Sequence, residues 1–432
     1  MLKKIINYIL FFLIILSGLL IFYLLDKYSE KNIIDFNPKN FIVYFYLLFL
    51  LLNILFLILI FFLRDNNKRN IFLFYLSTII TLYCIELVLN INNKYTAKKS
   101  LPSIYKNKLE QGIKYYPYIR PDYLDHKKKF KIYPLSSISN VNTLFCNEGE
   151  ARTYMSDRHG FNNKDSIWEK EIDVILIGDS FVHGSCVENK NNISSKLKRY
   201  SKKNVLNLGF SGSGPLIELG ILKEYAAIIK PDYLFWFYYE GNDMMDDISL
   251  LKSDYSKYLD SNYKQGLISK QKEIDMMLKN IANQKIDEYE NNNKSQTSNS
   301  FFASIKLFNI RYSIIRLFNK TSFTETSKIF KEFEKIIELT KSEVKNWNGK
   351  IIFVYIPDWS RYHLKQENND DFHLKKQVLE IINQKKIEII DIDREFSKSD
   401  NPLEYFSSKY KHTHYNKSGY DLISKKLSEY IK

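Results

Sequence analysis

The hydrophobic pattern divides the chain into an apolar N-terminal region and a longer part in which short apolar runs alternate with amphipathic ones. Three apolar stretches with almost no charge open the chain, at residues 5–25, 41–63 and 71–89. Each approaches the roughly 20 residues that a helix needs to cross the hydrocarbon core of a bilayer. The pattern predicts three transmembrane helices, at about 5–25, 41–63 and 70–91, in a membrane anchor over residues 1–91.

Basic residues around these stretches bear on the orientation of the anchor. Lys3 and Lys4 precede the first stretch, and Arg64, Lys68 and Arg69 follow the second, so all five fall on one side of the membrane. Lysines on the other side nearly balance them, but the dense second loop favours a cytoplasmic N-terminus. Three spans then place the C-terminal part outside the cytoplasm. The first apolar run exceeds the core of a signal peptide and lacks an Ala-x-Ala site, so we expect a retained anchor in a multi-pass membrane protein.

Beyond residue 150, apolar runs of strand length alternate with helical patterns. The predicted strands are 173–177, 204–208, 233–238, 350–356 and 386–391, and the predicted helices are 189–201, 214–229, 372–384 and 417–431. Strands that alternate with helices predict a parallel, doubly wound α/β sheet. We expect this domain to cover residues 151–432.

Two segments fall outside the alternation. Residues 92–150 are polar and contain several Tyr and Pro residues, and they predict a juxtamembrane stalk that packs partly on the domain. Residues 244–345 predict a helical insertion, with helices near 267–281, 301–318 and 327–347 and a polar low-complexity loop. The insertion follows the third predicted strand, so it is either a lid or substrate-binding cap, or a surface elaboration.

The first core strand ends in three small or polar residues, Gly178, Asp179 and Ser180. Chemistry in open α/β sheets lies outside the carboxyl ends of the strands, so Ser180 stands where a nucleophile would. A serine is a poor nucleophile unless a base, usually His, takes its proton. Without such a base, Asp179 and Ser180 are equally typical of an ordinary helix cap.

Three further blocks supply the missing groups. A glycine-rich loop with Gly209 and Gly212 follows the second strand, Asn242 follows the third, and His414 lies in the last loop, before the final helix. The order Ser, Gly, Asn, His in this strand context resembles the SGNH (GDSL-type) hydrolase superfamily, over residues 150–432.

The resemblance implies a flavodoxin-like doubly wound sheet and a serine ester hydrolase, in which Ser180 attacks an acyl carbonyl and His414 takes and returns the proton. The oxyanion would accept hydrogen bonds from the backbone N–H groups of Ser180 and Gly212 and from the Asn242 amide. Gly209, in the same loop, is the alternative to Gly212. The glycine spacing is not Gly-x-Gly-x-x-Gly and follows the second core strand, so it does not indicate a dinucleotide site, and we expect no cofactor.

The acidic partner of the base departs from the family pattern. The family usually carries Asp three residues before the His, and some relatives carry it two residues before; these positions are Lys411 and His412. Asp391 and Asp393, after the last strand, are the substitute candidates, and His412, at the position used by some relatives, is a further possible partner. The remaining alternatives are a Ser–His dyad whose imidazole is held by a backbone carbonyl, or an inactive domain.

The cysteines allow a disulfide in the C-terminal part, and the histidines do not show the spacing of a metal site. Cys84 lies in the third span, whereas Cys146 and Cys186 form an even pair in the C-terminal part, either as a disulfide outside the cytoplasm or as two free thiols. His159 and His183 lie near Ser180 in sequence but lack the ligand spacing of a metal site. We expect no metal.

The net charge of +14 is spread over the chain, and the tightest basic cluster is Lys127, Lys128, Lys129 and Lys131. This cluster would meet anionic headgroups or an acidic glycan, or it is a solvated loop. No nucleic-acid motif accompanies it, so we expect no nucleic-acid partner.

The sequence therefore predicts a membrane-anchored serine esterase, with the lipid bilayer and an acylated cell-envelope carbohydrate, or another ester, as its partners. The carbohydrate substrate is implied by the resemblance alone. Two alternatives remain open: an O-acyltransferase that passes the acyl group to a glycan, and a non-catalytic domain that binds glycan or partner proteins. The sequence does not set the oligomeric state.

Overall fold

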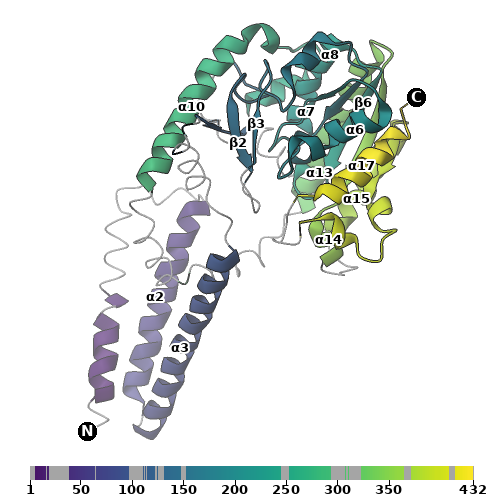
Figure 1. Cartoon of the computed structure of the whole chain (residues 1–432). Coiled ribbons are helices and arrows are strands. Elements are labelled where there is room, and N and C mark those ends of the chain that lie inside the picture. The colour runs from purple at the N-terminus through teal and green to yellow at the C-terminus, as the bar shows by residue number, and fades with distance from the viewer. Residues whose placement is uncertain are drawn as a thin grey trace. The chain divides into compact units, whose positions relative to one another are not determined.

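The fold is given by a computed structural model of the chain (Figure 1). It describes residues 5–15, 17–18, 38–63, 65–96, 110, 112, 114–121, 124, 131–146, 152–244, 253–292, 307, 310, 323–363, 371–407 and 414–431. The chain forms two compact units. One comprises Met1–Tyr95 with Thr297–Phe318, and the other comprises Thr96–Gln296 with Asn319–Lys432.

The first unit is built of apolar helices. They are a helix at Ile5–Ile15, α2 (Pro38–Phe62) and α3 (Asp65–Thr96). Among the residues that the structure describes, one helical stretch, Asn67–Leu89, is long and apolar enough to cross a membrane by length and composition. The other described apolar stretches, including Leu50–Phe62, are shorter. The structure thus supports one of the three predicted spans, and the other two stay predictions.

The second unit contains a five-stranded parallel sheet. Its strands are β4 (Val174–Ile177), β5 (Val205–Asn207), β6 (Tyr233–Tyr239), β7 (Lys350–Ile356) and β8 (Glu388–Asp391), in the order β5-β4-β6-β7-β8. Every neighbouring pair is parallel. This is the 2-1-3-4-5 order of flavodoxin-like sheets. The predicted α/β class with a parallel, doubly wound sheet is confirmed.

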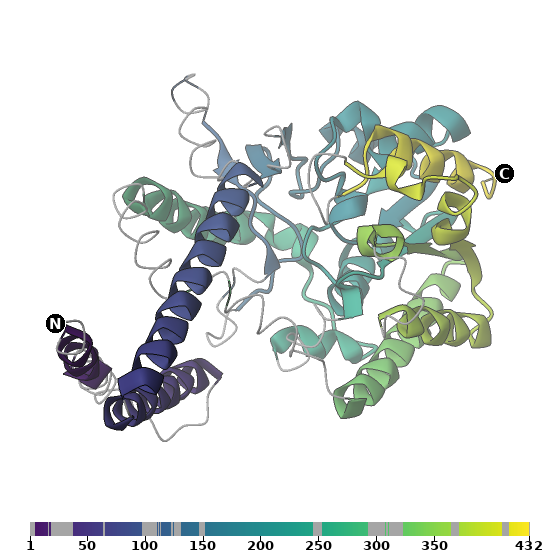
Figure 2. The ribbon, with the colours of Figure 1, turned by 90° about the horizontal axis from the view of Figure 1, so that it is seen from below.

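Helices cover both faces of this sheet, because successive strand residues point to opposite faces. On one face, Leu176 and Phe235 pack with α6 (Ile193–Ser201) and α17 (Lys417–Ser428). These two helices are far apart in sequence but in contact in space, as both views show (Figure 1, Figure 2). The other face is covered by three further helices, α7 (Pro215–Ile221), α13 (Phe323–Lys345) and α15 (Asp371–Gln384).

Part of the predicted stalk belongs to the same core. Residues 114–146 carry β1 (Tyr116–Pro117) and β2 (Asn142–Cys146), which form a small sheet with β3 (Arg152–Met155). The buried Tyr118 lies in one hydrophobic cluster with sheet residues of the second unit. The described residues of this segment are therefore packed on the domain.

Two buried charged residues join the insertion to η4 (Leu222–Ala226), the helical segment that continues α7. Lys223 donates to the carbonyl of Tyr258 at 2.9 Å, and Glu224 accepts the N–H groups of Gly266 at 2.8 Å and Leu267 at 3.0 Å. In the described part of the insertion, the elements between β6 and α13 are the short helices η5 (Asp254–Leu259) and η6 (Leu267–Lys270) and the long helix α10 (Gln271–Asn292). The predicted helix at 301–318 lies almost wholly outside the described residues.

Candidate active site

Ser180 is delivered to the mouth of the sheet by a tight turn after β4. A Cβ atom at Gly178 would lie 2.6 Å from Val182 Cγ2, so only glycine fits between the strand and the following helix. The buried Asp179 caps that helix, α5 (Ser180–His183), because its Oδ1 accepts the N–H of Phe181 at 2.9 Å. Ser180 itself is partly exposed, as a nucleophile must be.

His414 lies within hydrogen-bond reach of this serine. Its Nε2 atom is 2.8 Å from Ser180 Oγ, the distance expected between a nucleophile and its base. The next two residues fix the position of the histidine. The buried Tyr415 donates its hydroxyl to the carbonyl of Pro357 at 2.6 Å, and Asn416 caps α17 through the N–H of Ser418 at 2.8 Å.

A carboxylate also touches the nucleophile. Asp179 Oδ2 lies 3.1 Å from Ser180 Oγ and His414 Nε2 lies 2.8 Å from it, so the single hydroxyl proton has two acceptors within reach, a buried carboxylate and the imidazole. Burial raises the pKa of Asp179, and the Phe181 N–H and the neighbouring His414 charge offset part of that rise. Sequence reasoning treated Asp179 only as a capping residue, although it stands next to Ser180 in the chain.

The two glycines of the second block have different surroundings. The N–H of Gly209 donates to Asn207 Oδ1 at 2.8 Å, and a Cβ atom there would lie 2.3 Å from the backbone nitrogen of His183. Gly209 is thus a close-packing residue whose N–H is already used. Gly212 has a positive φ of 83° and is partly exposed, which favours Gly212 over Gly209 as an oxyanion donor.

Asn242 lies in the turn that ends β6. Its neighbour Asp243 is buried and accepts the Tyr239 N–H at 2.6 Å, which closes the turn onto the strand. Asn242 itself is partly exposed. Since β5, β4 and β6 are adjacent and parallel, the structure brings Gly212, Ser180 and Asn242 to one edge of the sheet, at the switch point where active sites of such sheets lie.

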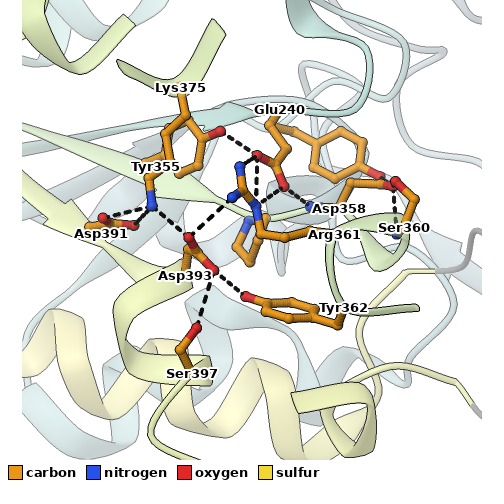
Figure 3. A network of polar contacts seen from close by, with 12 residues as sticks. Glu240, Tyr355, Asp358, Ser360, Arg361, Tyr362, Lys375, Asp391, Asp393 and Ser397 are labelled. Atoms are coloured by element: carbon orange, nitrogen blue, oxygen red, sulfur yellow. Dashed lines mark hydrogen bonds and ion pairs between the residues drawn. The ribbon is translucent and has the colours of Figure 1, made fainter. Parts of the chain in front are cut away.

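The two candidate acids, Asp391 and Asp393, take part in an ion network at the end of β8 (Figure 3). Lys375 Nζ lies 3.0 Å from Asp391 Oδ1 and 2.6 Å from Asp393 Oδ2. Burial raises the pKa of Asp393, but the hydrogen bond from Lys375 and the charge of Arg361 outweigh it and leave the pKa lowered. Both carboxylates are therefore used by cations of this network. Lys411 and His412, at the family's acid positions, lie outside the described residues.

The same network reaches back toward the site through Glu240 (Figure 3). Glu240 accepts from Arg361 Nε at 2.8 Å and from the Asp358 N–H at 2.7 Å. Asp358 also accepts the hydroxyl of Tyr239, whose ring lies 4.4 Å from that of Phe181, next to Ser180. The network thus fixes the ends of β6 and β7 beside the site.

His414 has a second neighbour that sequence reasoning did not identify. Its Nδ1 atom lies 3.6 Å from Cys186 Sγ, and the structure joins Cys186 to Cys146 in a disulfide with a Cα–Cα distance of 5.3 Å. The bond links β2 to the loop after the nucleophile. The two residues are far apart in sequence, so no local signal could have placed Cys186 beside His414.

The other histidines near Ser180 are packing residues. His183 is buried among the rings of Tyr118, Phe145 and Tyr154, with Nε2 3.1 Å from the Tyr154 hydroxyl. Burial lowers the pKa of His183 to about 3, so the ring is neutral. His159 packs against Trp168, with ring centroids 4.5 Å apart. Within the described part of the chain, no group of three or more His, Cys, Asp or Glu side chains is arranged to hold a metal.

Comparisons with known proteins return only distant structural likenesses. No protein-family model matches the chain, and no curated protein sequence matches it significantly. Among solved structures, the chain is similar to a protein from Desulfitobacterium hafniense DCB-2 that is described as lipolytic and of the G-D-S-L family. The identity is 16%, the TM-score is 0.35, and the match covers 59% of this chain and 97% of that chain.

Two further solved structures are similar to the chain at comparably low identity and TM-score. The lipase/acylhydrolase from Enterococcus faecalis has 14% identity and a TM-score of 0.35, over 60% of this chain and 97% of that chain. A GDSL-like lipase from Bacteroides thetaiotaomicron VPI-5482 has 11% identity and a TM-score of 0.32, over 61% and 89%. At such scores the activity has to be argued from the residues of this chain. Two of these three proteins are described as being of the G-D-S-L family or GDSL-like.

Proposed function

We propose that this chain is a serine ester hydrolase of the SGNH (GDSL) type. The observation that carries the proposal is the 2.8 Å contact between Ser180 Oγ and His414 Nε2 at the carboxyl edge of a flavodoxin-like sheet. Gly212 and Asn242 follow the two strands adjacent to that of Ser180, where an oxyanion would be held. The fold alone would not support an activity; the arrangement of these side chains does.

The reaction follows from this geometry. Ser180 Oγ attacks the acyl carbonyl while His414 Nε2 takes the hydroxyl proton, and the carbonyl oxygen becomes an oxyanion that accepts from Ser180 N–H, Gly212 N–H and Asn242. The C–O bond to the alcohol breaks, and His414 returns its proton to the leaving oxygen. Water, deprotonated by the same imidazole, then attacks the acyl-serine and releases the acid with free Ser180.

A fluorophosphonate probe tests this proposal directly, because it phosphonylates activated serines. The full-length protein in detergent should be labelled, and Ser180→Ala should abolish the labelling. Ser195→Ala, which removes a hydroxyl on α6, is the matched control and should label like wild type. Equal labelling of wild type and Ser180→Ala would reject the nucleophile, and absence of any labelling would leave the non-catalytic alternative.

The proposal includes a membrane anchor and a cell-envelope carbohydrate ester as the substrate. The anchor is supported by the apolar helix at Asn67–Leu89 and by the two further apolar stretches of the sequence. A C-terminal alkaline phosphatase fusion should be active if the hydrolase unit lies outside the cytoplasm; activity of a cytoplasmic reporter alone would reject that topology. Release of free acid from an acetylated glycan distinguishes hydrolysis from transfer, in which a new sugar ester appears.

A further inference from the structure

We propose that Arg120 forms an anion-binding subsite beside the oxyanion loop, so that the substrate is an acyl ester bearing a carboxylate or phosphate close to the ester bond. This inference rests on the proposed esterase function. The contact that carries it lies at Gly212. A Cβ atom built on Gly212 would be 3.1 Å from Arg120 Nε and 3.5 Å from Cζ, so the guanidinium lies directly against this glycine.

The backbone around Arg120 is fixed, although the side chain itself is exposed. Tyr118 and Ile119 are buried, at 6% and 1% exposed. The Tyr118 hydroxyl accepts the N–H of Ser211 at 2.8 Å, and the Tyr118 N–H donates to the carbonyl of Leu144 at 3.0 Å. The segment is therefore tied on one side to the oxyanion loop and on the other to β2. It places the exposed Arg120 side chain at the rim of the site, against Gly212.

The chemistry of a guanidinium selects the ligand class. Its planar array of donors binds carboxylate and phosphate groups in a bidentate manner and remains charged at all relevant pH values. Gly212 is the proposed oxyanion donor, so a group that meets Arg120 lies next to the reacting carbonyl. An acetylated sugar with a carboxylate or phosphate on the ring meets this requirement, whereas a neutral sugar ester leaves the guanidinium without that contact.

The test compares substrates that differ only in charge. The full-length protein is assayed on three monoacetylated methyl glycosides: that of glucuronic acid with its carboxylate free, that of glucose 6-phosphate, and that of glucose. We expect wild type to favour at least one charged ester over the neutral one by about tenfold in kcat/KM, the size of one charged hydrogen bond. The preference should shrink as salt is raised, since ionic strength screens exposed charges. The two charged esters distinguish a carboxylate from a phosphate.

Variants separate recognition from a structural role. Arg120→Gln should remove the preference for charged esters mainly by raising their KM, while kcat/KM for the neutral ester stays within about twofold of wild type. Arg120→Lys should restore part of the preference. Arg199→Gln is the matched control, because this exposed arginine of α6 donates to the Lys190 carbonyl. A wild type without charge preference, or an equal loss on charged and neutral esters in Arg120→Gln, would overturn the inference while leaving the esterase intact.

Binding decides the inference even if no ester is hydrolysed. Calorimetry on the Ser180→Ala variant with the same esters should show tighter binding of a charged ester, and Arg120→Gln in that background should abolish the difference. Equal binding of charged and neutral esters would reject the subsite. Failure of the fluorophosphonate test, in contrast, would reject the hydrolase and not the anion site.

Discussion

The Nδ1 atom of His414 lies 3.6 Å from the Sγ atom of Cys186, which is bonded to Cys146. In a full catalytic triad this nitrogen donates to a carboxylate, which fixes the tautomer and stabilises the imidazolium. A disulfide sulfur carries no charge and is a weak acceptor. It can hold the imidazole by contact but cannot supply the electrostatic stabilisation of an acid.

Loss of the disulfide should lower both stability and activity. The bridge closes a loop of 40 residues, so the double variant Cys146→Ser/Cys186→Ser should lose about 3–4 kcal/mol of unfolding free energy. The loop that contacts His414 is then released from β2, so the rate of fluorophosphonate labelling should fall by about tenfold, a loss of ~1.4 kcal/mol of transition-state stabilisation. Melting temperature and labelling rate of the full chain measure the two effects.

The control for this prediction is Cys84→Ser, which removes the exposed free thiol of the N-terminal unit. It should leave both quantities unchanged. Treatment of wild type with dithiothreitol should reproduce the double variant. A reduced protein that labels as fast as the oxidised one would show that the disulfide does not position His414.

A carboxylate placed at the family's acid position should raise the rate. Loss of the acid from a complete triad costs about 10⁴ in kcat, so even a partly aligned carboxylate in Lys411→Asp or His412→Asp should raise kcat at least tenfold on aryl esters. Asp393→Asn should instead leave kcat within a few-fold and lower the melting temperature, because Asp393 contacts Lys375 and Tyr362. If Asp393→Asn lowers kcat by about 10³ or more with an unchanged melting temperature, Asp393 acts on the histidine after all.

The sequence was most informative where each strand ends in a short polar block. A parallel strand is buried on both faces and reads as a continuous apolar run, so 173–177 and 233–238 could be predicted together with the residues that follow them. The strands that pair with one another could not be read from these runs alone. The flavodoxin-like order came from the family resemblance, and the hydrogen bonds of the structure agree with it.

Contacts between distant segments could not be predicted from local patterns. Tyr118 and Arg120 lie in a segment without periodicity, and their contacts with the Gly212 loop depend on how the small sheet packs. Asp391 and Asp393 were chosen because they follow a strand, as active-site residues do. That rule does not distinguish the edge strand β8, where these side chains meet Lys375, from the strands beside β4.

Asn242 should contribute to the transition state and little to substrate binding. If its amide donates to the oxyanion, Asn242→Ala should lower kcat by about 10²–10³ with KM nearly unchanged. Asn204→Ala is the matched control, because Asn204 donates to the Glu171 carbonyl just before β5, at the opposite end of the sheet. A rise in KM at constant kcat would assign Asn242 to substrate positioning, and unchanged kinetics would remove it from the site.

The buried His183 should make the protein less stable in acid. Burial lowers its pKa to about 3, whereas an unfolded histidine titrates near its ordinary value of 6.5. Between pH 6.5 and pH 3, His183 is protonated in the unfolded state and neutral in the native state. The unfolding free energy therefore falls as the pH is lowered below about 6.5. The loss is ~1.4 kcal/mol per pH unit, or about 2 kcal/mol between pH 6.5 and pH 5.

The variant His183→Phe isolates this effect. Phenylalanine keeps an aromatic ring among Tyr118, Phe145 and Tyr154 but gives up the 3.1 Å contact with the Tyr154 hydroxyl, so the variant should be less stable than wild type at pH 7.5. Phenylalanine does not titrate, so this acid-dependent loss is absent from the variant. The difference in unfolding free energy between wild type and variant should therefore narrow by about 2 kcal/mol as the pH is lowered to 5. Burial also lowers the pKa of His159, but that histidine is common to both proteins and cancels in the difference. If the difference in unfolding free energy stays constant from pH 7.5 to pH 5, His183 titrates alike in the native and unfolded states, and its ring is not held neutral in the native protein.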